Sequence, residues 1–390
     1  MAKSNTGDYC KATTRLIWNG LKFRGTGLTK AAAKPTVISL AVTNRCNSHC
    51  IMCNIWKRAS EEADIKSREM SREQIIGILS HPLLSELVEL DLTGGEPHLR
   101  EDLADIAIAI GGLKKSALPR LRSLIITTNG LLPPRIIANY QRILESLKGT
   151  DIDLVSVNSI DGIGATHDLI RGTRGAFELA TQTLDGLLEL RKDYPNFIIG
   201  IKTTIVPDNV NMLGAILDFA LERGLFHIIS PALFTEARFR NLEKRDTLAL
   251  STARYGDVLE FYRLDSLRTD YFYSTARDFL ITGRKRWTCA ALYNYLFIDF
   301  DGAVYPCEII AEPIGNVKEQ DLAEIWQGTA ARHWRHGIGK LECCRTCHEP
   351  GAIRYSAYAE GWSYLKFLAA LGRHEFDETY HRGGFGKYFT

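Results

Sequence analysis

Short apolar runs alternate with longer amphipathic segments between residues 36 and 229. Runs of four to eight apolar and β-branched residues between turn residues predict strands, and apolar residues three and four positions apart predict helices. The strand pattern occurs at residues 36–42, 87–92, 121–127, 152–157, 198–205 and 226–229. The helix pattern occurs between them, at residues 72–79, 99–110, 134–147, 176–190 and 213–222.

This alternation predicts an α/β fold. Ser71 and Gln74 form a capping-box pattern, which places a helix start at the first of these helical segments. Strands that alternate with helices through right-handed crossovers form a parallel sheet covered by helices. Six such units predict an open (β/α)6 partial TIM barrel, whose functional loops follow the carboxyl ends of the strands.

The flanking regions have different patterns. Residues 11–24 have helical spacing among basic residues; they predict a helix packed on the domain, although such helices also bind anionic membranes. Charged helices such as 253–264 follow the barrel, then a turn-rich cysteine region, a helix at 364–371 and a Gly/aromatic stretch at 383–389. We therefore predict an N-terminal extension, the barrel, a helical bridge, a small cysteine domain and a tail at residues 1–34, 35–236, 237–286, 287–350 and 351–390.

Composition narrows the function. Lys plus Arg number 48 against 46 for Asp plus Glu, so bulk charge implies no nucleic-acid partner. No apolar run reaches the roughly 18 residues of a membrane span, and the first residues lack a signal-peptide core. Nine cysteines without an export signal indicate metal binding or catalysis in a cytoplasmic protein.

Three cysteines, Cys46, Cys50 and Cys53, lie directly after the first predicted strand. Iron–sulfur clusters are held by cysteine thiolates, normally four to a cubane. Three thiolates on one short loop would leave one iron open for another ligand. Two alternatives are a zinc site completed by a residue such as His49 and buried core thiols.

The Cys-x3-Cys-x2-Cys spacing after a first strand resembles the signature of the radical SAM enzymes. The resemblance implies a 4Fe–4S cluster whose open iron binds S-adenosylmethionine, and an electron donor of the flavodoxin or ferredoxin type. It also implies reductive cleavage to a 5′-deoxyadenosyl radical, which abstracts a hydrogen atom from a substrate. The (β/α)6 partial barrel is the core fold of this family.

A Gly-Gly-Glu-Pro run, Gly94, Gly95, Glu96 and Pro97, follows the second predicted strand. Glycines allow a ligand to approach the backbone closely. In the family this run hydrogen-bonds the amino group of S-adenosylmethionine. Alone it would predict only a turn; one βα unit after the cysteine loop it indicates a cofactor site.

Thr128 and Asn129, after the third predicted strand, resemble the family's ribose- and methionine-contacting segment; a plain strand-to-turn signal is the alternative. Many members have an aromatic residue directly before the third cysteine. This chain has Met52 there, with Trp56 as the nearest aromatic, which leaves the adenine contacts undefined.

The segment after the fourth predicted strand resembles a run found in members with C-terminal cluster domains. Ser159 and Asp161 belong to this run; Ser159 is expected to contact the ribose, and Arg171 the methionine carboxylate. His167 and Asp168 are interpreted as a helix-start pair on the surface. Lys202, on the fifth strand, is expected either to point into the barrel or to extend outward.

The second cysteine group resembles the SPASM/twitch auxiliary-cluster domains. Asp301-Gly302 predicts a hairpin turn that places Cys289 and Cys307 on neighbouring strands. The resemblance implies a short, twitch-like form with one fully ligated auxiliary 4Fe–4S cluster, held by Cys289, Cys307, Cys344 and Cys347. Cys343 could replace Cys344, and a structural zinc site is the alternative.

A fully ligated cluster is expected to transfer electrons, which favours a net oxidation or bond formation over a redox-neutral isomerisation, although epimerases of the family also have auxiliary clusters. Such an oxidation needs a base near the reacting atoms. The candidates beside the second cysteine group are Glu308, Glu312 and Glu349.

We therefore predict a radical SAM oxidoreductase that acts on a small molecule by dehydrogenation or bond formation. The segment before residue 35 is shorter than the roughly 50 residues of a small domain, so no peptide-recognition domain is expected there. A ribosomal-peptide-modifying enzyme is the second possibility. A non-enzymatic zinc or iron–sulfur scaffold is the alternative from another class.

Overall fold

The structure is a computed structural model that describes residues 6–29, 32–62, 64–371, 375 and 386–388. The chain forms two compact units. We call Lys34–Leu250 with Leu296–Ile325 the barrel unit. We call Met1–Ala33, Ser251–Tyr295 and Trp326–Thr390 the helical unit.

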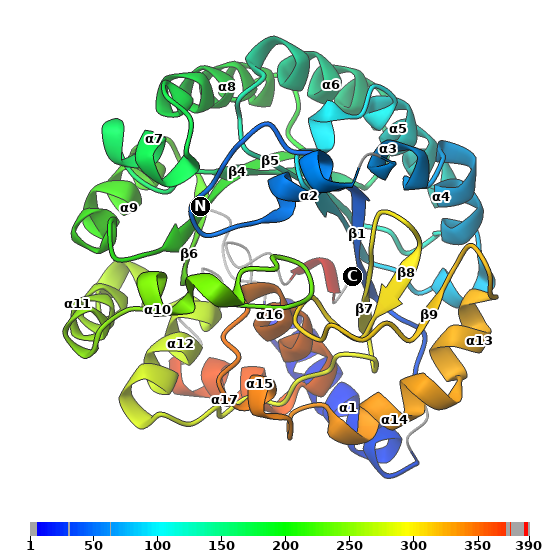
Figure 1. Ribbon diagram of the computed structural model, residues 1–390. Helices are drawn as coiled ribbons and strands as arrows, with labels where there is room; N and C mark the ends of the chain where they lie inside the picture. Colours follow the sequence, from blue (N-terminus) through cyan, green and yellow to red (C-terminus); the bar gives the residue numbers. More distant parts are fainter. Residues whose placement is uncertain (1–5, 30–31, 63, 372–374, 376–385, 389–390) are drawn as a thin grey trace. The chain divides into compact units, whose positions relative to one another are not determined.

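The sheet of the barrel unit has the predicted core of parallel strands in chain order (Figure 1). The strands are β1 Val37–Thr43, β2 Glu89–Gly94, β3 Ser123–Thr128, β4 Asp153–Ser159, β5 Phe197–Ile205 and β6 Phe226–Pro231. Their order is β6-β5-β4-β3-β2-β1, and each adjacent pair is parallel. The prediction of an α/β partial barrel is confirmed.

An antiparallel extension continues the sheet beyond β1. It consists of β7 Tyr295–Ile298, β8 Ala303–Tyr305 and β9 Gly315–Asn316. The predicted hairpin turn joins β7 to β8, and Gly302 there has φ +89°, a backbone conformation that favours glycine.

The two faces of the parallel strands differ in chemistry because side chains alternate along a strand. Leu40, Leu90 and Leu124 are fully or almost fully buried on one face. On the other, inner face, Ser39, Asp91 and Ile125 lie in register on β1, β2 and β3. An inner apolar cluster continues this face across β3, β4 and β6: Ile125, Val155, Val157 and Phe226.

Helices follow the strands of the barrel unit, and α4, α5, α6, α8 and α9 lie outside the arc of strands (Figure 1). They are α2 Ile55–Glu61, α3 Ile65–Arg68, α4 Arg72–Leu79, α5 Leu103–Gly112, α6 Pro133–Ser146, α7 Ala165–Arg171, α8 Ala176–Arg191, α9 Leu213–Glu222 and α10 Arg245–Leu248. The capping box at Ser71 and Gln74 is present, which confirms the predicted start of α4.

The helical unit gathers segments that are far apart in the sequence. It contains α1 Thr6–Thr29, α11 Thr252–Tyr262, α12 Tyr271–Thr282, α14 Thr329–Gly337, α15 Glu342–Arg345, α16 Pro350–Glu360 and α17 Trp362–Leu371, while α13 Leu322–Gln327 lies at the division between the units. Helix α1 packs against α16 and α17. A Cβ at Gly361 would lie 2.2 Å from the Leu16 carbonyl oxygen, so glycine permits this close packing.

None of the helices described here is long and apolar enough to cross a membrane. The division into units assigns residues 237–250 to the barrel unit and 251–286 to the helical unit, whereas the sequence predicted one bridge over 237–286. The domain boundaries stay predictions. Of the Gly/aromatic stretch at 383–389, only residues 386–388, a short 3₁₀ turn, lie within the described part.

Gly200 on β5 is a test of the inner-face packing. A Cβ there would lie 2.4 Å from the Phe226 ring, so Gly200→Ala has to displace that ring from the inner apolar cluster. We expect a loss of about 1–3 kcal/mol of stability, measured as a lower thermal unfolding midpoint.

The matched control is Gly77→Ala in α4, where a Cβ would meet nothing within 4 Å. This change is expected to stabilise the protein by about 0.5–1 kcal/mol because it restricts the unfolded chain. An unchanged midpoint for Gly200→Ala would contradict the packing described for Phe226.

Candidate cluster and cofactor site

The cysteine loop starts at the carboxyl end of β1, where the Gly94-Gly95 segment packs against it. The Gly95 N–H donates to the Thr43 carbonyl oxygen at 2.8 Å, and the Glu96 N–H to the Arg45 carbonyl oxygen at 2.8 Å. A Cβ would lie 2.0 Å from Thr43 O at Gly94 and 2.2 Å from Arg45 O at Gly95. Both glycines are therefore required by the close approach of two backbones.

Glu96 is buried and its carboxylate accepts bonds from the protein itself. The donors are the Asn129 N–H at 2.7 Å, the His98 N–H at 3.0 Å and the Thr128 hydroxyl at 3.0 Å. Burial raises the pKa of Glu96 to about 7, against the lowering effect of these bonds. The side chain thus fixes Thr128 and Asn129 relative to the Gly-Gly-Glu-Pro run; Pro97 begins the short 3₁₀ turn after it.

Each of the three thiols receives at least one hydrogen-bond donor. Asn129 Nδ2 lies 3.8 Å from Cys46 Sγ, and the Ile55 N–H lies 3.4 Å from Cys53 Sγ. Arg171 Nη1 lies 3.5 Å from Cys50 Sγ. Donors to sulfur stabilise the thiolate form and tune the potential of a bound cluster.

The loop is tied to the end of α7. The His49 N–H donates to the Arg171 carbonyl oxygen at 3.0 Å, and the Ile51 N–H to the Ile170 carbonyl oxygen at 2.9 Å. At Gly172, which has φ +60°, a Cβ would lie 2.3 Å from the His49 carbonyl oxygen. The Arg-Gly pair at the end of this helix therefore serves to dock the cysteine loop.

Arg171 forms a buried ion pair with Asp161, with 2.7 Å between Arg171 Nη2 and Asp161 Oδ2. The Thr204 N–H donates to the other oxygen of Asp161 at 2.7 Å. Burial by itself lowers the pKa of Arg171, but the charges of Asp161 and Cys50 outweigh it and raise that pKa. The expected contact between Arg171 and a methionine carboxylate stays a prediction, because the described partners of Arg171 are Asp161 and Cys50.

The surface position predicted for His167 is wrong. This side chain is fully buried, and its Nδ1 accepts a hydrogen bond from the Asp161 N–H at 3.1 Å. Burial lowers the pKa of His167 to about 3, so the ring is neutral and can accept that bond. Asp168 accepts bonds from the Gly175 and Phe177 N–H groups at the start of α8, at 2.7 and 2.8 Å.

Ser159 lies at the end of β4, in register with Lys202 on β5. Met52, the residue directly before the third cysteine, is buried, and its carbonyl oxygen accepts from Asn241 Nδ2 at 2.7 Å. The Trp56 ring packs edge-on against the His49 ring with 4.9 Å between centroids. The Trp56 indole Nε1–H also donates to the Cys53 carbonyl oxygen at 2.9 Å.

The thiols suit an iron–sulfur cluster. Burial, and then the neighbouring Cys50, raise the pKa of Cys53 to about 11, and the same causes raise the pKa of Cys46. Three thiolates this close together therefore need a compensating cation, which a cluster would supply. Within the described ranges no three His, Cys, Asp or Glu side chains form a group that could hold a single metal ion.

The auxiliary group is described in part. Cys344 and Cys347 are both buried in the helical unit, and Cys343 is exposed, which favours Cys344 as the ligand. A hydrogen bond from Cys343 lowers the pKa of Cys344 to about 6, and burial raises that of Cys347 to about 12. The charge of Lys285 lowers both.

One expectation about this group is wrong. Cys289 lies in an irregular segment before β7, and Cys307 lies two residues after the end of β8, so neither is on a strand. Cys289 belongs to the helical unit and Cys307 to the barrel unit. The four-thiolate ligand set Cys289, Cys307, Cys344 and Cys347 therefore stays a prediction.

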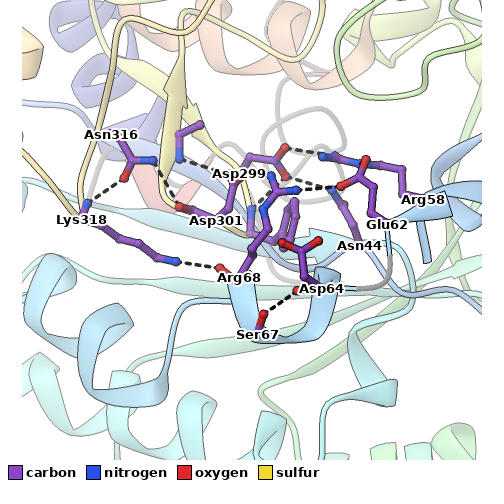
Figure 2. Close-up of polar contacts among 12 residues, drawn as sticks. Asn44, Arg58, Glu62, Asp64, Ser67, Arg68, Asp299, Asp301, Asn316 and Lys318 are labelled. Atoms are coloured by element: carbon purple, nitrogen blue, oxygen red, sulfur yellow. Dashed lines mark hydrogen bonds and ion pairs between the residues drawn. The ribbon is translucent and has the colours of Figure 1, made fainter. Parts of the chain in front are cut away.

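A polar network connects the segment after Cys53 to the β7–β8 hairpin (Figure 2). Arg58 in α2 pairs with Asp299 at 3.5 Å, and Arg68 in α3 pairs with Asp301 at 2.6 Å. Both arginines also pair with Glu62, and both lie over the Phe300 ring. The network fixes the exit of the cysteine loop against the strand that leads to Cys307.

The three acid/base candidates have different surroundings. Glu312 is exposed. Glu349 caps the start of α16, with its oxygens accepting from the Gly351 and Ala352 N–H groups. Glu308 extends to the inner face of the barrel, where Ser39 Oγ donates to it at 3.1 Å.

Sequence reasoning missed two residues on this face, Asp91 and Arg238. Asp91 shares the Ser39 hydroxyl with Glu308, at 3.3 Å, and Arg238 forms an ion pair with Glu308. An acidic residue in the middle of an apolar strand was the available signal for Asp91. Arg238 had no comparable signal, because it lies in the segment after β6 where the periodic pattern ends.

Two family models match the chain. The radical SAM superfamily model matches residues 40–220, which include the cysteine loop, the Gly-Gly-Glu-Pro run and Arg171. The model of the SPASM iron–sulfur cluster-binding domain matches residues 289–348. The chain belongs to the radical SAM superfamily. Its radical SAM domain binds S-adenosylmethionine and a 4Fe–4S cluster. Its SPASM domain binds auxiliary iron–sulfur clusters.

The sequence of this radical SAM protein is similar to those of known proteins over most of its length. It is 26% identical to the AdoMet-dependent heme synthase of Methanosarcina barkeri, over 85% of this chain and 95% of that protein. It is 25% identical to the sporulation killing factor maturation protein SkfB of Bacillus subtilis, over 83% of this chain and 70% of that protein. These relatives support SAM-dependent radical catalysis by an enzyme.

A solved structure supports the fold. The structure of native anSMEcpe with bound AdoMet and Cp18Cys peptide aligns with a TM-score of 0.54 at 17% identity, covering 88% of this chain and 99% of that one. At this identity the likeness concerns the fold, and it agrees with a partial TIM barrel.

Gly172 is the sharpest test of how the cysteine loop is held. Gly172→Ala adds a Cβ 2.3 Å from the His49 carbonyl oxygen, which has to displace the loop between Cys46 and Cys50. We expect anaerobic reconstitution to yield roughly four fewer irons per chain, because the loop no longer presents three thiolates to one cubane. Iron analysis of the reconstituted protein measures this loss.

Gly175→Ala is the matched control. Gly175 has φ +76°, so alanine there has a similar backbone cost, but its Cβ would meet nothing within 4 Å. Its iron content is expected to equal that of the wild type. Equal iron losses in the two variants would show that backbone strain, and not docking against His49, controls the site.

Proposed function

We propose that this enzyme abstracts a hydrogen atom from a C–H bond of a small-molecule substrate. We further propose that it completes a net oxidation or a bond formation, assisted by the auxiliary 4Fe–4S cluster. Its electrons would come from a flavodoxin- or ferredoxin-type protein. Tetrapyrroles are the first substrate class to test.

The proposal of radical chemistry depends on one observation. The sulfurs of Cys46, Cys50 and Cys53 lie on a loop that packs closely against Gly94 and Gly172, and each sulfur has a hydrogen-bond donor beside it. When bound there, the cluster and S-adenosylmethionine supply a 5′-deoxyadenosyl radical. The protein's part is to hold the thiolates, orient the cofactor and place the substrate.

The small-molecule class is supported by the match to the heme synthase, which covers 85% of this chain and 95% of that protein. The inner face of the barrel supports it as well. There the inner apolar cluster lies on the same face as charged side chains, an arrangement that suits a compact ligand with an apolar skeleton and polar substituents.

Net oxidation requires a group that accepts the proton released when the substrate radical loses an electron. Glu308 is a carboxylate on the inner face, where a substrate in the barrel would be within reach. We propose Glu308 as the base; Glu312 is exposed, and the Glu349 carboxylate caps the start of α16.

A second candidate is modification of a ribosomal peptide. The similarity to SkfB, a maturation protein for a sporulation killing factor, favours it. A peptide substrate would have to bring one residue to the inner face, whereas a tetrapyrrole would present its ring substituents there. The two possibilities differ in which substrate class stimulates cofactor cleavage.

The reconstituted and reduced enzyme should release 5′-deoxyadenosine faster with an iron porphyrin bearing propionate side chains than without substrate. Mass spectrometry should show a porphyrin product that has lost hydrogen or carbon dioxide with hydrogen. Use of a porphyrin deuterated on its side chains should transfer deuterium to 5′-deoxyadenosine, because the radical takes its hydrogen atom from that position.

The control is a set of synthetic cysteine-containing peptides under the same conditions. Stimulation by peptides with no response to porphyrins would replace the proposed substrate class with the second candidate. Background cleavage that no tested substrate raises would contradict both.

A further inference from the structure

The inner face of the barrel unit contains a charged group that the cofactor chemistry does not use. Asp91 on β2 and Glu308 after β8 share the Ser39 hydroxyl, which lies 3.3 Å from Asp91 Oδ2 and 3.1 Å from Glu308 Oε1. Two cations, Arg238 after β6 and Lys202 on β5, act electrostatically on both carboxylates.

Arg238 and Glu308 compensate each other. Arg238 Nη1 forms an ion pair with Glu308 Oε1, and Arg238 Nη2 donates to the Thr93 hydroxyl. Burial raises the pKa of Glu308, but Arg238 and Lys202 outweigh burial and lower it. Both partners of this pair are therefore ionised, and their charges cancel. The charges of Lys202 and Asp91 are not balanced by this pair.

Lys202 and Asp91 are both incompletely satisfied. Among the described residues, the Lys202 side chain has no ion-pair partner within 4 Å and makes no hydrogen bond, although it is only half exposed. Asp91 Oδ1 is buried and accepts no hydrogen bond in the same part of the chain. Buried polar groups are usually paired, so two unpaired groups on one face indicate a missing ligand.

The protonation of Asp91 sets the charge of this face. Burial and the neighbouring Glu308 and Glu89 raise the pKa of Asp91 to about 7, against the lowering effect of Arg238 and Lys202. Counting only Arg238, Lys202, Glu308 and Asp91, the group has a net charge of +1 when Asp91 is protonated, and Asp91 then offers an O–H donor. When Asp91 is ionised, the same four side chains sum to zero and that donor is lost.

We propose that Lys202 and Asp91 bind a carboxylate of the substrate on the inner face of the barrel, beside the inner apolar cluster. A carboxylate accepts from both groups at once, and a single negative charge cancels the charge that Lys202 leaves. An amine would be repelled by Lys202. A phosphate dianion would leave a charge uncompensated.

This assignment rests on the proposed function in one respect, namely that the substrate is a small molecule within the barrel. It names the chemical group by which the substrate is positioned. The carboxylate side chains of porphyrins belong to this class, as do those of many other metabolites. The test therefore uses a probe that is independent of turnover.

The probe is 4-fluorobenzoate, whose carboxylate and ring match the two parts of the site. Its binding to the reconstituted full chain is followed by fluorine NMR titration. At pH 6, Lys202→Met should weaken binding by about tenfold or more, the loss typical of one charge-assisted hydrogen bond. The matched control is Lys192→Met, which removes an exposed lysine paired with Glu189 and should leave binding unchanged.

Asp91→Asn tests the coupling to protonation. In the wild type, affinity should fall about tenfold or more between pH 6 and pH 8.5, because Asp91 loses the proton it donates. The asparagine side chain introduced by this substitution keeps an N–H donor but does not titrate, so D91N should bind with little pH dependence. Iron content and the thermal unfolding midpoint confirm that each variant is folded.

Three results would overturn the assignment: no binding of 4-fluorobenzoate by the wild type, equal affinity in Lys202→Met, or the same pH dependence in Asp91→Asn. Tighter binding of 4-fluorophenyl phosphate would also contradict it. If porphyrins fail as substrates while 4-fluorobenzoate behaves as expected, the proposed substrate class fails and the carboxylate site stands. If the probe fails to bind while porphyrins are turned over, the carboxylate site fails and the proposed substrate class stands.

Discussion

The structure around the cysteine loop depends on the cost of burying negative charge. Burial, and then the charge of the neighbouring Cys50, raise the pKa values of Cys46 and Cys53. The chain offsets this cost with donors from three directions, and of these three donors Arg171 carries a formal positive charge. Arg171 is itself held by Asp161, so this buried ion pair fixes both the loop and the charge at Cys50.

Most of the fold could be predicted because it follows from local patterns. The six parallel strands and the helices at Arg72–Leu79 and Leu213–Glu222 lie where the apolar periodicity places them. The burial of His167 could not be predicted, since it depends on a hydrogen bond from the backbone of Asp161. The expected strand position of Cys289 is wrong for a similar reason: the hairpin turn is visible in the sequence, but the length of β7 is not.

The candidate site divides in the same way. Close spacing revealed the cysteines and the glycine runs, and the structure adds why glycine is needed at Gly94 and Gly172. The proximity of Asp91 and Arg238 could not be predicted from the sequence, because the two residues lie far apart in the chain. The curvature of the barrel brings Asp91 to Ser39 and Arg238 to Glu308, which also contacts Ser39. On an inner barrel face, the substrate and not the fold determines which charged residues are present.

The central claim is that the Cys46–Cys53 loop holds a cubane with one iron left open for S-adenosylmethionine. Electron paramagnetic resonance of the reduced protein tests it most directly, in a Cys344→Ala, Cys347→Ala variant that lacks two of the four predicted auxiliary ligands. The account predicts the signal of a reduced 4Fe–4S cluster, and a change of its g values when S-adenosylmethionine is added. A signal that S-adenosylmethionine leaves unchanged, or no cluster signal in oxygen-free preparations, would contradict it.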